Sequence, residues 1–230
     1  MKDILKYLKS VGFSPKTIID GGVAWGTFDL YEVFPDAYYY MFEPIEEFFP
    51  DINNILEKHK GQLCHQALSD TDGKLIITKN KKKEWKDPTF ASHKNFDQGE
   101  DIDSREVEQI KLDTFFKDVD FTGPVLLKTD LQGHDLSALR GARHFLKSCD
   151  VIISEISFLP IYRNKCNSIN DFTTYLADNN FVCVDICDPL RVPKPAGPLM
   201  QVDAVFLKKD SPLYTSYNEE QTKTINSQKI

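Results

Sequence analysis

Residues 17–44 read TIIDGGVAWGTFDLYEVFPDAYYYMFEP, and this stretch decides the fold. Its first apolar segment ends at Asp20, and a turn that contains Gly22 and Gly26 separates it from a short helical pattern. The nearly continuous aromatic and apolar run over residues 37–42 is typical of a strand buried on both faces. The stretch therefore predicts a strand, a glycine turn, a helix and a second strand.

The same alternation continues along the chain. Strands are also predicted at residues 63–68, 124–130 and 150–156, with helical patterns between most of them. Strands that alternate with helices of this kind indicate a parallel sheet with right-handed crossovers. Two closing strands, 181–186 and 201–208, are joined by a short proline-rich segment without a helical pattern. We expect these two strands to pair in the antiparallel direction.

A single domain is predicted over residues 1–209. Within it, residues 79–104 are polar, aperiodic and too long for an ordinary connection, so they form either a lid or a partly disordered insert. Residues 210–230 are rich in Ser, Thr, Asn, Gln and Glu and have little to bury. We expect them to form a loosely held polar tail.

The composition excludes several classes of protein. Hydrophobic residues make up 41% and charged residues 27%, as in soluble globular proteins. A net charge of −7 argues against general nucleic-acid binding, because phosphates are neutralised by a basic surface. No apolar run reaches the ~20 residues of a membrane-spanning helix, and the five cysteines lack the paired spacing of a zinc site. A cytoplasmic protein that binds neither nucleic acid nor membrane is expected; a homodimer is left open.

The glycine turn indicates the kind of ligand. Its Gly-x-x-x-Gly spacing, from Gly22 to Gly26, differs from the Gly-x-Gly-x-x-Gly of dinucleotide-binding proteins, and Asp20 would repel a pyrophosphate and favour a cation. Glu43 ends the second strand, where a carboxylate can accept hydrogen bonds from both ribose hydroxyls. Together these residues suit a nucleoside that carries a positively charged amino acid, as S-adenosylmethionine does. The alternative is that the glycines only end a strand and Glu43 caps a helix.

Several stretches, in order along residues 18–208, resemble the FkbM-type S-adenosylmethionine-dependent methyltransferases. IIDGGVAWGTF and FPDAYYYMFEP are similar to the family's Asp-Val-Gly-Ala-Asn-x-Gly turn and to its strand ending Phe-Glu-Pro. LLKTDLQGHDLSALRGA resembles its Lys-Ile-Asp-Val-Gln/Glu-Gly signature, and HQALSDTDGK, VEQIKLDTFF and QVDAVF resemble further segments. The chain departs from the pattern at Val23-Ala24, where the family usually has Ala-Asn, and at His134, where it often has Ala.

The resemblance implies an α/β fold of the class I methyltransferase (Rossmann-like) type. This is a three-layer sandwich with a seven-stranded, mainly parallel sheet and an antiparallel strand near the C-terminus. It also implies methyl transfer from S-adenosylmethionine to a hydroxyl of a sugar, a glycan or a small natural product. By the same resemblance, Ser69 and Asp70 read the adenine ring, and Asp130 and Gln132 line the junction of cofactor and acceptor.

The catalytic candidates follow the fourth strand of the predicted sheet. Ligands of parallel α/β sheets meet the carboxyl ends of the strands, and methyl transfer to a hydroxyl needs a base. Asp130 and His134 are both candidates; a nearby helix N-terminus would keep His134 neutral. The spacing of these residues and Glu155 does not require a metal, and none is predicted. The candidate acceptor-binding residues are Trp85, Glu155, Tyr162 and Arg163.

Other readings of these residues stay open. Asp130 could be purely structural, and Trp85 could belong to a solvated run of charge rather than stack on an acceptor. For the whole chain, an NAD-dependent oxidoreductase is disfavoured by the turn spacing and by Asp20. A non-catalytic binding module that keeps the fold without turnover is the other alternative, which the departure at Val23-Ala24 permits.

Overall fold

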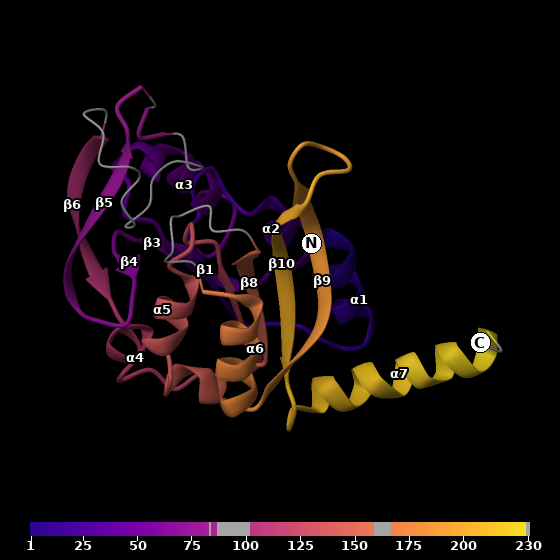
Figure 1. Cartoon of the computed structure of the whole chain (residues 1–230). Coiled ribbons are helices and arrows are strands. Elements are labelled where there is room, and N and C mark those ends of the chain that lie inside the picture. The colour runs from indigo at the N-terminus through magenta and orange to yellow at the C-terminus, as the bar shows by residue number, and fades with distance from the viewer. Residues whose placement is uncertain (83, 87–101, 159–166, 229–230) are drawn as a thin grey trace.

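A seven-stranded sheet forms the centre of the computed structural model, which describes residues 1–82, 84–86, 102–158 and 167–228 (Figure 1). All neighbouring strands are parallel except β10, which is antiparallel to both its neighbours, β8 and β9. In sheet order the strands are β3 (Gly61–Cys64), β2 (Tyr38–Phe42), β1 (Thr17–Gly21), β7 (Val125–Thr129), β8 (Val151–Ser157), β10 (Leu199–Lys208) and β9 (Phe181–Arg191). The predicted fold class and the antiparallel closing pair are confirmed.

Helices cover both faces of this sheet. One layer consists of α1 (Lys2–Ser10), α2 (Phe28–Val33), the 3₁₀ turn η1 (Glu46–Phe48) and α3 (Phe49–Leu56). The other consists of α4 (Leu112–Phe115), α5 (Asp135–Arg140), the 3₁₀ turn η3 (Phe145–Ser148) and α6 (Ile169–Asp178). Ile18 of β1 packs into the first layer and Ile19 into the second, because successive strand side chains point to opposite faces. A strand buried on both faces therefore reads as continuously apolar.

A second, three-stranded sheet stands beside the first. It has the order β4 (Ala67–Leu68), β6 (Ile102–Ile110) and β5 (Gly73–Asn80). The strand predicted over residues 63–68 is divided between the two sheets, since β3 ends at Cys64 and β4 begins at Ala67. The ends of the predicted lid, residues 79–80 and 102–104, belong to the β5–β6 hairpin, while residues 87–101 lie outside the described residues.

Ion pairs attach this hairpin to the first helical layer. Arg105 of β6 donates two hydrogen bonds of 2.7 Å to the carboxylate of Glu47. Lys86 lies 2.6 Å from a carboxylate oxygen of Asp51 on α3. The hairpin is therefore held against α3 and η1, beside the end of β2.

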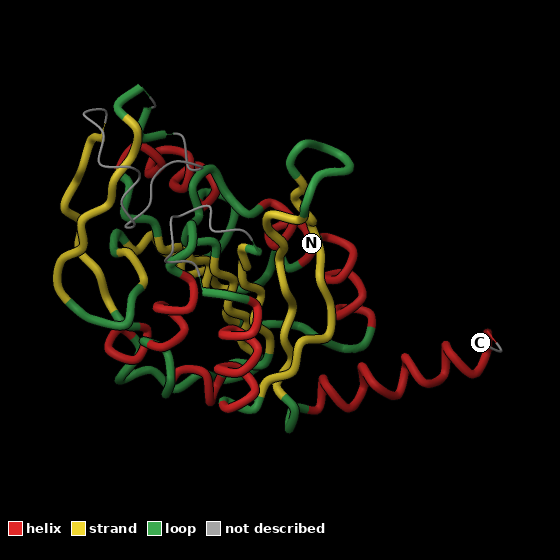
Figure 2. Tube along the Cα trace, in the orientation of Figure 1, coloured by secondary structure: helices red, strands yellow, loops and turns green. Residues whose placement is uncertain are grey.

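The C-terminal segment differs from the expected loose tail. Residues 212–228 form α7 (Pro212–Gln228), and Leu213 in its first turn is buried in the core. Tyr217 packs edge-on against Tyr7 of α1 at a centroid distance of 5.5 Å, whereas residues 222–227 are exposed. Figure 2 shows the far half of this helix leaving the rest of the chain. Within the described ranges, no helix combines the length and the apolar character needed to cross a membrane.

Candidate active site

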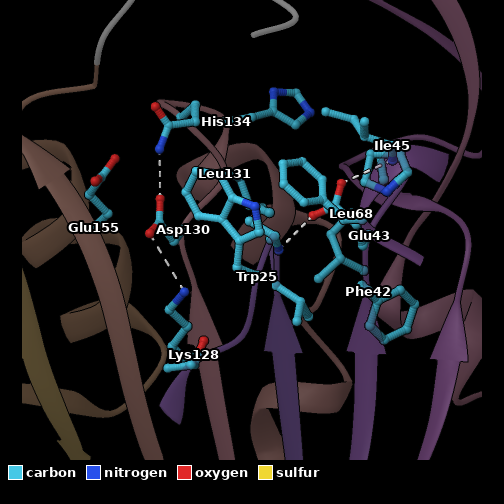
Figure 3. Close-up of a pocket in the computed structure, with 18 of the residues that line it drawn as sticks. Trp25, Phe42, Glu43, Ile45, Leu68, Lys128, Asp130, Leu131, His134 and Glu155 are labelled. Carbon is cyan, nitrogen blue, oxygen red and sulfur yellow. Dashed lines mark hydrogen bonds and ion pairs between the residues drawn. The ribbon is translucent and has the colours of Figure 1, made fainter. Parts of the chain in front are cut away.

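A cavity of about 770 Å³ lies at the carboxyl ends of the parallel strands (Figure 3). The turn after β1, the end of β2 and the end of β7 form its floor. Leu75 and Ile77 of the β5–β6 hairpin contribute one wall, and Glu155 of β8 and Asp203 of β10 contribute the opposite end. This is the edge of an open α/β sheet at which ligands bind, and the volume is that of a small-molecule site.

The conformation and close packing of the turn after β1 require glycine at two positions. Gly22 has a φ of +77°, and a Cβ built on it would lie 2.0 Å from the carbonyl oxygen of Asp130. Its N–H donates to the carbonyl of Phe42 at 2.9 Å, which links the turn to the end of β2. Gly26 has a φ of +119°, and a Cβ there would lie 2.6 Å from Ile55 Cδ1. Both predicted glycines line the cavity, and Gly22 joins the ends of three strands.

Asp20 does not line the cavity, contrary to its predicted cofactor contact. It is fully buried behind the turn, where it accepts hydrogen bonds from Thr27 Oγ1 at 3.0 Å and from the Tyr31 hydroxyl at 2.9 Å. Burial raises the pKa of this carboxyl, and Lys128, 3.8 Å away, together with the two donors counteracts that rise. The acid therefore ties α2 to β1 and supports the turn from behind.

Glu43 lines the cavity at the end of β2, as predicted. Its Oε2 accepts the N–H of Ala24 and its Oε1 accepts the N–H of Ile45, both at 2.9 Å. Burial raises the pKa of Glu43 to about 7, with the two backbone donors opposing the rise. Each carboxylate oxygen has further acceptor capacity, so this fixed group can still bind hydroxyl donors from the cavity.

Three side chains at the end of β7 form a polar group. Lys128 Nζ lies 3.6 Å from Oδ2 of Asp130, and Gln132 Nε2 donates to Oδ1 of Asp130 at 2.9 Å. Lys128 is only 5% exposed, whereas about a third of the Asp130 side chain is accessible. All three line the cavity, and Asp130 is the carboxylate that they hold in place. Figure 3 shows Lys128 pointing toward Asp130.

His134 lines the cavity next to this group but faces another partner. Its Nε2 lies 3.0 Å from the Ser69 hydroxyl oxygen, and the side chain is almost completely buried. Ser69 itself is buried outside the cavity lining, and Asp70 is exposed outside it as well. The structure therefore places the two predicted adenine-reading residues behind His134 or on the surface, rather than at the cavity wall.

Glu155 and Asp203 stand opposite each other on adjacent strands. They are register partners of β8 and β10, and both line the cavity. Burial raises the pKa of Glu155 to about 9 and that of Asp203 to about 6. Glu155 was predicted to bind the acceptor, but Asp203 and Lys128 were missed. A charged residue inside an otherwise apolar strand is the signal that could have found both.

Trp85 does not line the cavity. Its Nε1 donates to Asp103 at 3.0 Å, and the Lys79 ammonium and the Arg105 guanidinium lie 5.1 Å and 4.3 Å from the centroid of its ring. The half-buried side chain therefore packs on the β5–β6 hairpin. Tyr162 and Arg163, the other predicted acceptor-side residues, lie outside the described residues.

The cavity fits the predicted cofactor in shape and in charge. A carboxylate at the end of β2 and a close backbone turn after β1 can hold a nucleoside, and the acids beyond β7 favour a positive group. Glu155 Oε2 is buried and has no hydrogen-bond partner in the described part of the chain, so the site contains an unsatisfied polar atom that faces this region. These features define a class I methyltransferase fold with its cofactor cleft.

Comparisons with known proteins also indicate a methyltransferase fold. The family model for the methyltransferase FkbM domain matches residues 21–183. TehB from Haemophilus influenzae is similar in structure, with a TM-score of 0.50 and 8% identity over 91% of this chain and 62% of TehB. EvdMO1 has a TM-score of 0.50 and 10% identity over 90% of this chain and 40% of its own. A putative methyltransferase from Streptococcus mutans, solved with S-adenosylhomocysteine, has a TM-score of 0.49 and 12% identity over 90% of this chain and 97% of its own.

At these identities the structures show the shared fold alone, and no curated protein sequence matches the chain. The family match covers most of the chain, so the protein belongs to the FkbM methyltransferase family. It is thus an S-adenosylmethionine-dependent methyltransferase, which confirms the predicted family and cofactor. The oxidoreductase alternative loses its support.

Proposed function

We propose that the protein transfers the methyl group of S-adenosylmethionine to a hydroxyl oxygen of a sugar, a glycan or a small natural product. The observation that carries this proposal is the Asp130 carboxylate. It faces the cavity at the end of β7, partly accessible, between Lys128 at 3.6 Å and Gln132 at 2.9 Å. A carboxylate fixed at the sheet edge is what a hydroxyl acceptor requires, because its proton must be taken up as it attacks.

The chain's own residues supply positioning and a base. When bound, S-adenosylmethionine supplies an activated methyl group. Glu43 and the Gly22 turn hold the nucleoside, and Leu75 and Ile77 form an apolar wall of the same cavity. Asp130 accepts the hydroxyl proton while the new carbon–oxygen bond forms and the carbon–sulfur bond breaks. Asp130 suits this role better than His134, whose Nε2 already faces Ser69.

The cofactor half of the proposal is tested by calorimetric titration. We expect S-adenosylhomocysteine to bind with one-to-one stoichiometry and NADH to give no saturable heat. Binding of NADH without S-adenosylhomocysteine would contradict the methyltransferase assignment. Binding of S-adenosylhomocysteine without turnover of any acceptor would instead support the non-catalytic module.

The acceptor half is tested by following methyl transfer from labelled S-adenosylmethionine to sugars, oligosaccharides and hydroxylated natural products. Asp130→Asn should bind S-adenosylhomocysteine like the wild type and lower the rate about 10²- to 10⁴-fold, the usual contribution of a general base. Asp36→Asn, an exposed change of the same kind, should leave the rate unchanged. Products methylated at nitrogen or carbon, or full activity of Asp130→Asn, would refute the proposed chemistry.

A further inference from the structure

The far end of the cavity contains more carboxyl groups than cations. Asp130, Glu155 and Asp203, here called the carboxyl cluster, all line this end. Two cations of the described chain line the cavity near them, and each also has another carboxylate partner: Lys128 faces the buried Asp20 at 3.8 Å, and the amino group of Met1 lies 2.5 Å from Asp188. Buried charges of one sign are normally avoided unless a partner compensates them. The excess therefore points to a positively charged ligand group.

The arrangement of Glu155 and Asp203 strengthens this argument. Residues directly opposite on antiparallel strands have Cβ atoms roughly 4.5–5.5 Å apart, and like charges there destabilise the sheet. Glu155 and Asp203 occupy such positions on β8 and β10. Glu155 Oε2 is also buried without a hydrogen-bond partner among the described residues. Ionisation of both carboxyls is therefore costly in the empty protein, and such a pair is expected where a bound ligand compensates the second charge.

The cofactor has a positive group that can reach this end. Glu43 and Glu155 lie on opposite sides of the same cavity, with the glycine turn and Asp130 between them (Figure 3). A nucleoside held at Glu43 directs the rest of the molecule along the sheet edge toward β7 and β8. S-adenosylmethionine carries a sulfonium charge in that part, and its product, S-adenosylhomocysteine, has a neutral sulfur in the same position.

We propose that the carboxyl cluster recognises the charge of the cofactor sulfur. In this proposal the Glu155–Asp203 pair shares a proton in the empty protein, releases it when the sulfonium binds, and keeps it when the neutral product binds. The proposal rests on the cofactor assignment made above but not on the identity of the acceptor. It makes Glu155 and Asp203 specificity residues that distinguish the substrate form of the cofactor from the spent form.

The charged surroundings of the pair support a shared proton near neutral pH. For Glu155, burial raises the pKa to about 9, with Asp130, Asp135 and Asp203 adding to the rise and Lys128 opposing it. For Asp203, burial raises the pKa to about 6. Asp130 and Asp188 add to that rise, and Lys128 and the amino group of Met1 oppose it. Together these values leave one proton to be lost between about pH 6 and pH 9.

The direction of the pH effect follows from linkage. A bound positive charge favours the ionised carboxyls, so sulfonium binding must release protons and must strengthen as the pH rises through this range. The neutral product lacks that charge. Both ligands share the ribose, so titration of Glu43 largely cancels in the ratio of their dissociation constants. The sulfonium lowers the pKa of the amino group in S-adenosylmethionine, whereas S-adenosylhomocysteine has no such charge, so the amino pKa of each free ligand is measured and the ratio is corrected for it. The corrected ratio reports on the charge of the sulfur.

Calorimetry of the full chain with S-adenosylmethionine and S-adenosylhomocysteine tests the proposal without any acceptor. Titrations in buffers of different ionisation enthalpy count the protons released. We expect more protons to be released with S-adenosylmethionine than with S-adenosylhomocysteine. We also expect the corrected ratio of the dissociation constant of S-adenosylhomocysteine to that of S-adenosylmethionine to rise about 3- to 10-fold from pH 6.5 to pH 9, as one added charge contact would give.

Two variants and one control test whether Glu155 and Asp203 cause the pH dependence of the ratio of dissociation constants. Glu155→Gln and Asp203→Asn keep the side-chain shape, and each should flatten the pH dependence of the ratio. Glu108→Gln, an exposed glutamate of β6, should leave it as in the wild type. Equal proton release with both ligands and a ratio independent of pH in the wild type would overturn this proposal alone. If neither ligand binds, the cofactor assignment fails together with it.

Discussion

Gly22 and Asp130 approach each other so closely that no side chain fits between them. A Cβ on Gly22 would lie 2.0 Å from the carbonyl oxygen of Asp130, and 2.9 Å from its carbonyl carbon. The contact joins the turn that follows β1 to the residue that follows β7, so it fixes the distance between the nucleoside side of the cleft and the proposed base. The glycine is needed for this contact as well as for its positive φ.

Gly22→Ala should destabilise the protein by about 2–4 kcal/mol, since overpacking adds to the cost of a left-handed backbone. It should also weaken S-adenosylhomocysteine binding in the fraction that remains folded. Gly12→Ala is the matched control, because Gly12 has a φ of +101° with no atom within 4 Å of the added Cβ. It should cost only about 1–2 kcal/mol and leave binding unchanged. Thermal unfolding and calorimetry measure both effects, and equal losses for the two variants would contradict the packing argument.

Glu43 is expected to contribute binding free energy through the ribose hydroxyls. Glu43→Gln loses the charge and replaces one acceptor oxygen, with two of the four lone-pair positions, by an NH₂ donor, and should weaken S-adenosylhomocysteine binding by about 1–3 kcal/mol. Because the pKa of Glu43 is about 7 in the empty protein, wild-type affinity should also fall below pH 7, where the carboxyl binds a proton. The control is Glu57→Gln, which is exposed. Calorimetric affinities from pH 5.5 to pH 8 that are the same for Glu43→Gln and wild type would rule out this role.

The sequence predicted the cleft better than it predicted what each residue does there. Gly22 and Glu43 lie directly after strand ends and Gly26 lies just before α2, and such ends of elements can be recognised from their own few residues. Asp20 was also correctly placed at the end of β1. Its partners, however, are Tyr31 and Thr27, whose side chains meet it only after α2 has packed against the sheet.

Long-range pairing explains the residues that sequence reasoning missed. Asp203 reaches the cavity because β10 inserts beside β8, and the pairing of Glu155 with Asp203 is a matter of strand register. Such register is set by the whole sheet, which no local motif encodes. The surroundings of Trp85 were not predicted for a similar reason, since its cationic neighbours Lys79 and Arg105 come from two different strands.

Trp85 is expected to stabilise the hairpin instead of binding the acceptor. Trp85→Ala removes the ring beside Lys79 and Arg105 and the hydrogen bond to Asp103, so the β5–β6 strands should open more readily. Hydrogen exchange should be faster in β5 and β6, whereas exchange in β7 and β8 should be unchanged. Trp85→Phe, which keeps a ring for the two cations, should give a smaller effect. Unchanged exchange in the hairpin, with a selective loss of acceptor affinity, would restore the stacking role.

Asp135 should make the stability of the protein depend on pH. It is completely buried, its Oδ1 accepts the N–H of Leu131 at 3.1 Å, and its Oδ2 has no hydrogen-bond partner among the described residues. Burial, assisted by Asp130, raises its pKa to about 7, whereas the unfolded chain has the ordinary value near 3.9. The folded state therefore holds more protons between these two values, and the free energy of unfolding must fall as the pH rises through that window.

Asp135→Asn keeps an acceptor for Leu131 and removes the ionisation. Between pH 4 and pH 8 the free energy of unfolding should fall in both proteins. The fall should be about 2–4 kcal/mol smaller in the variant than in the wild type, since each unit of pKa shift corresponds to about 1.4 kcal/mol. Glu155 and Glu43 have raised pKa values too, so some decline should remain in the variant. Asp118→Asn, at an exposed position, should follow the wild-type curve. Urea unfolding at several pH values gives the comparison, and parallel curves for Asp135→Asn and wild type would show that the buried carboxyl does not control this dependence.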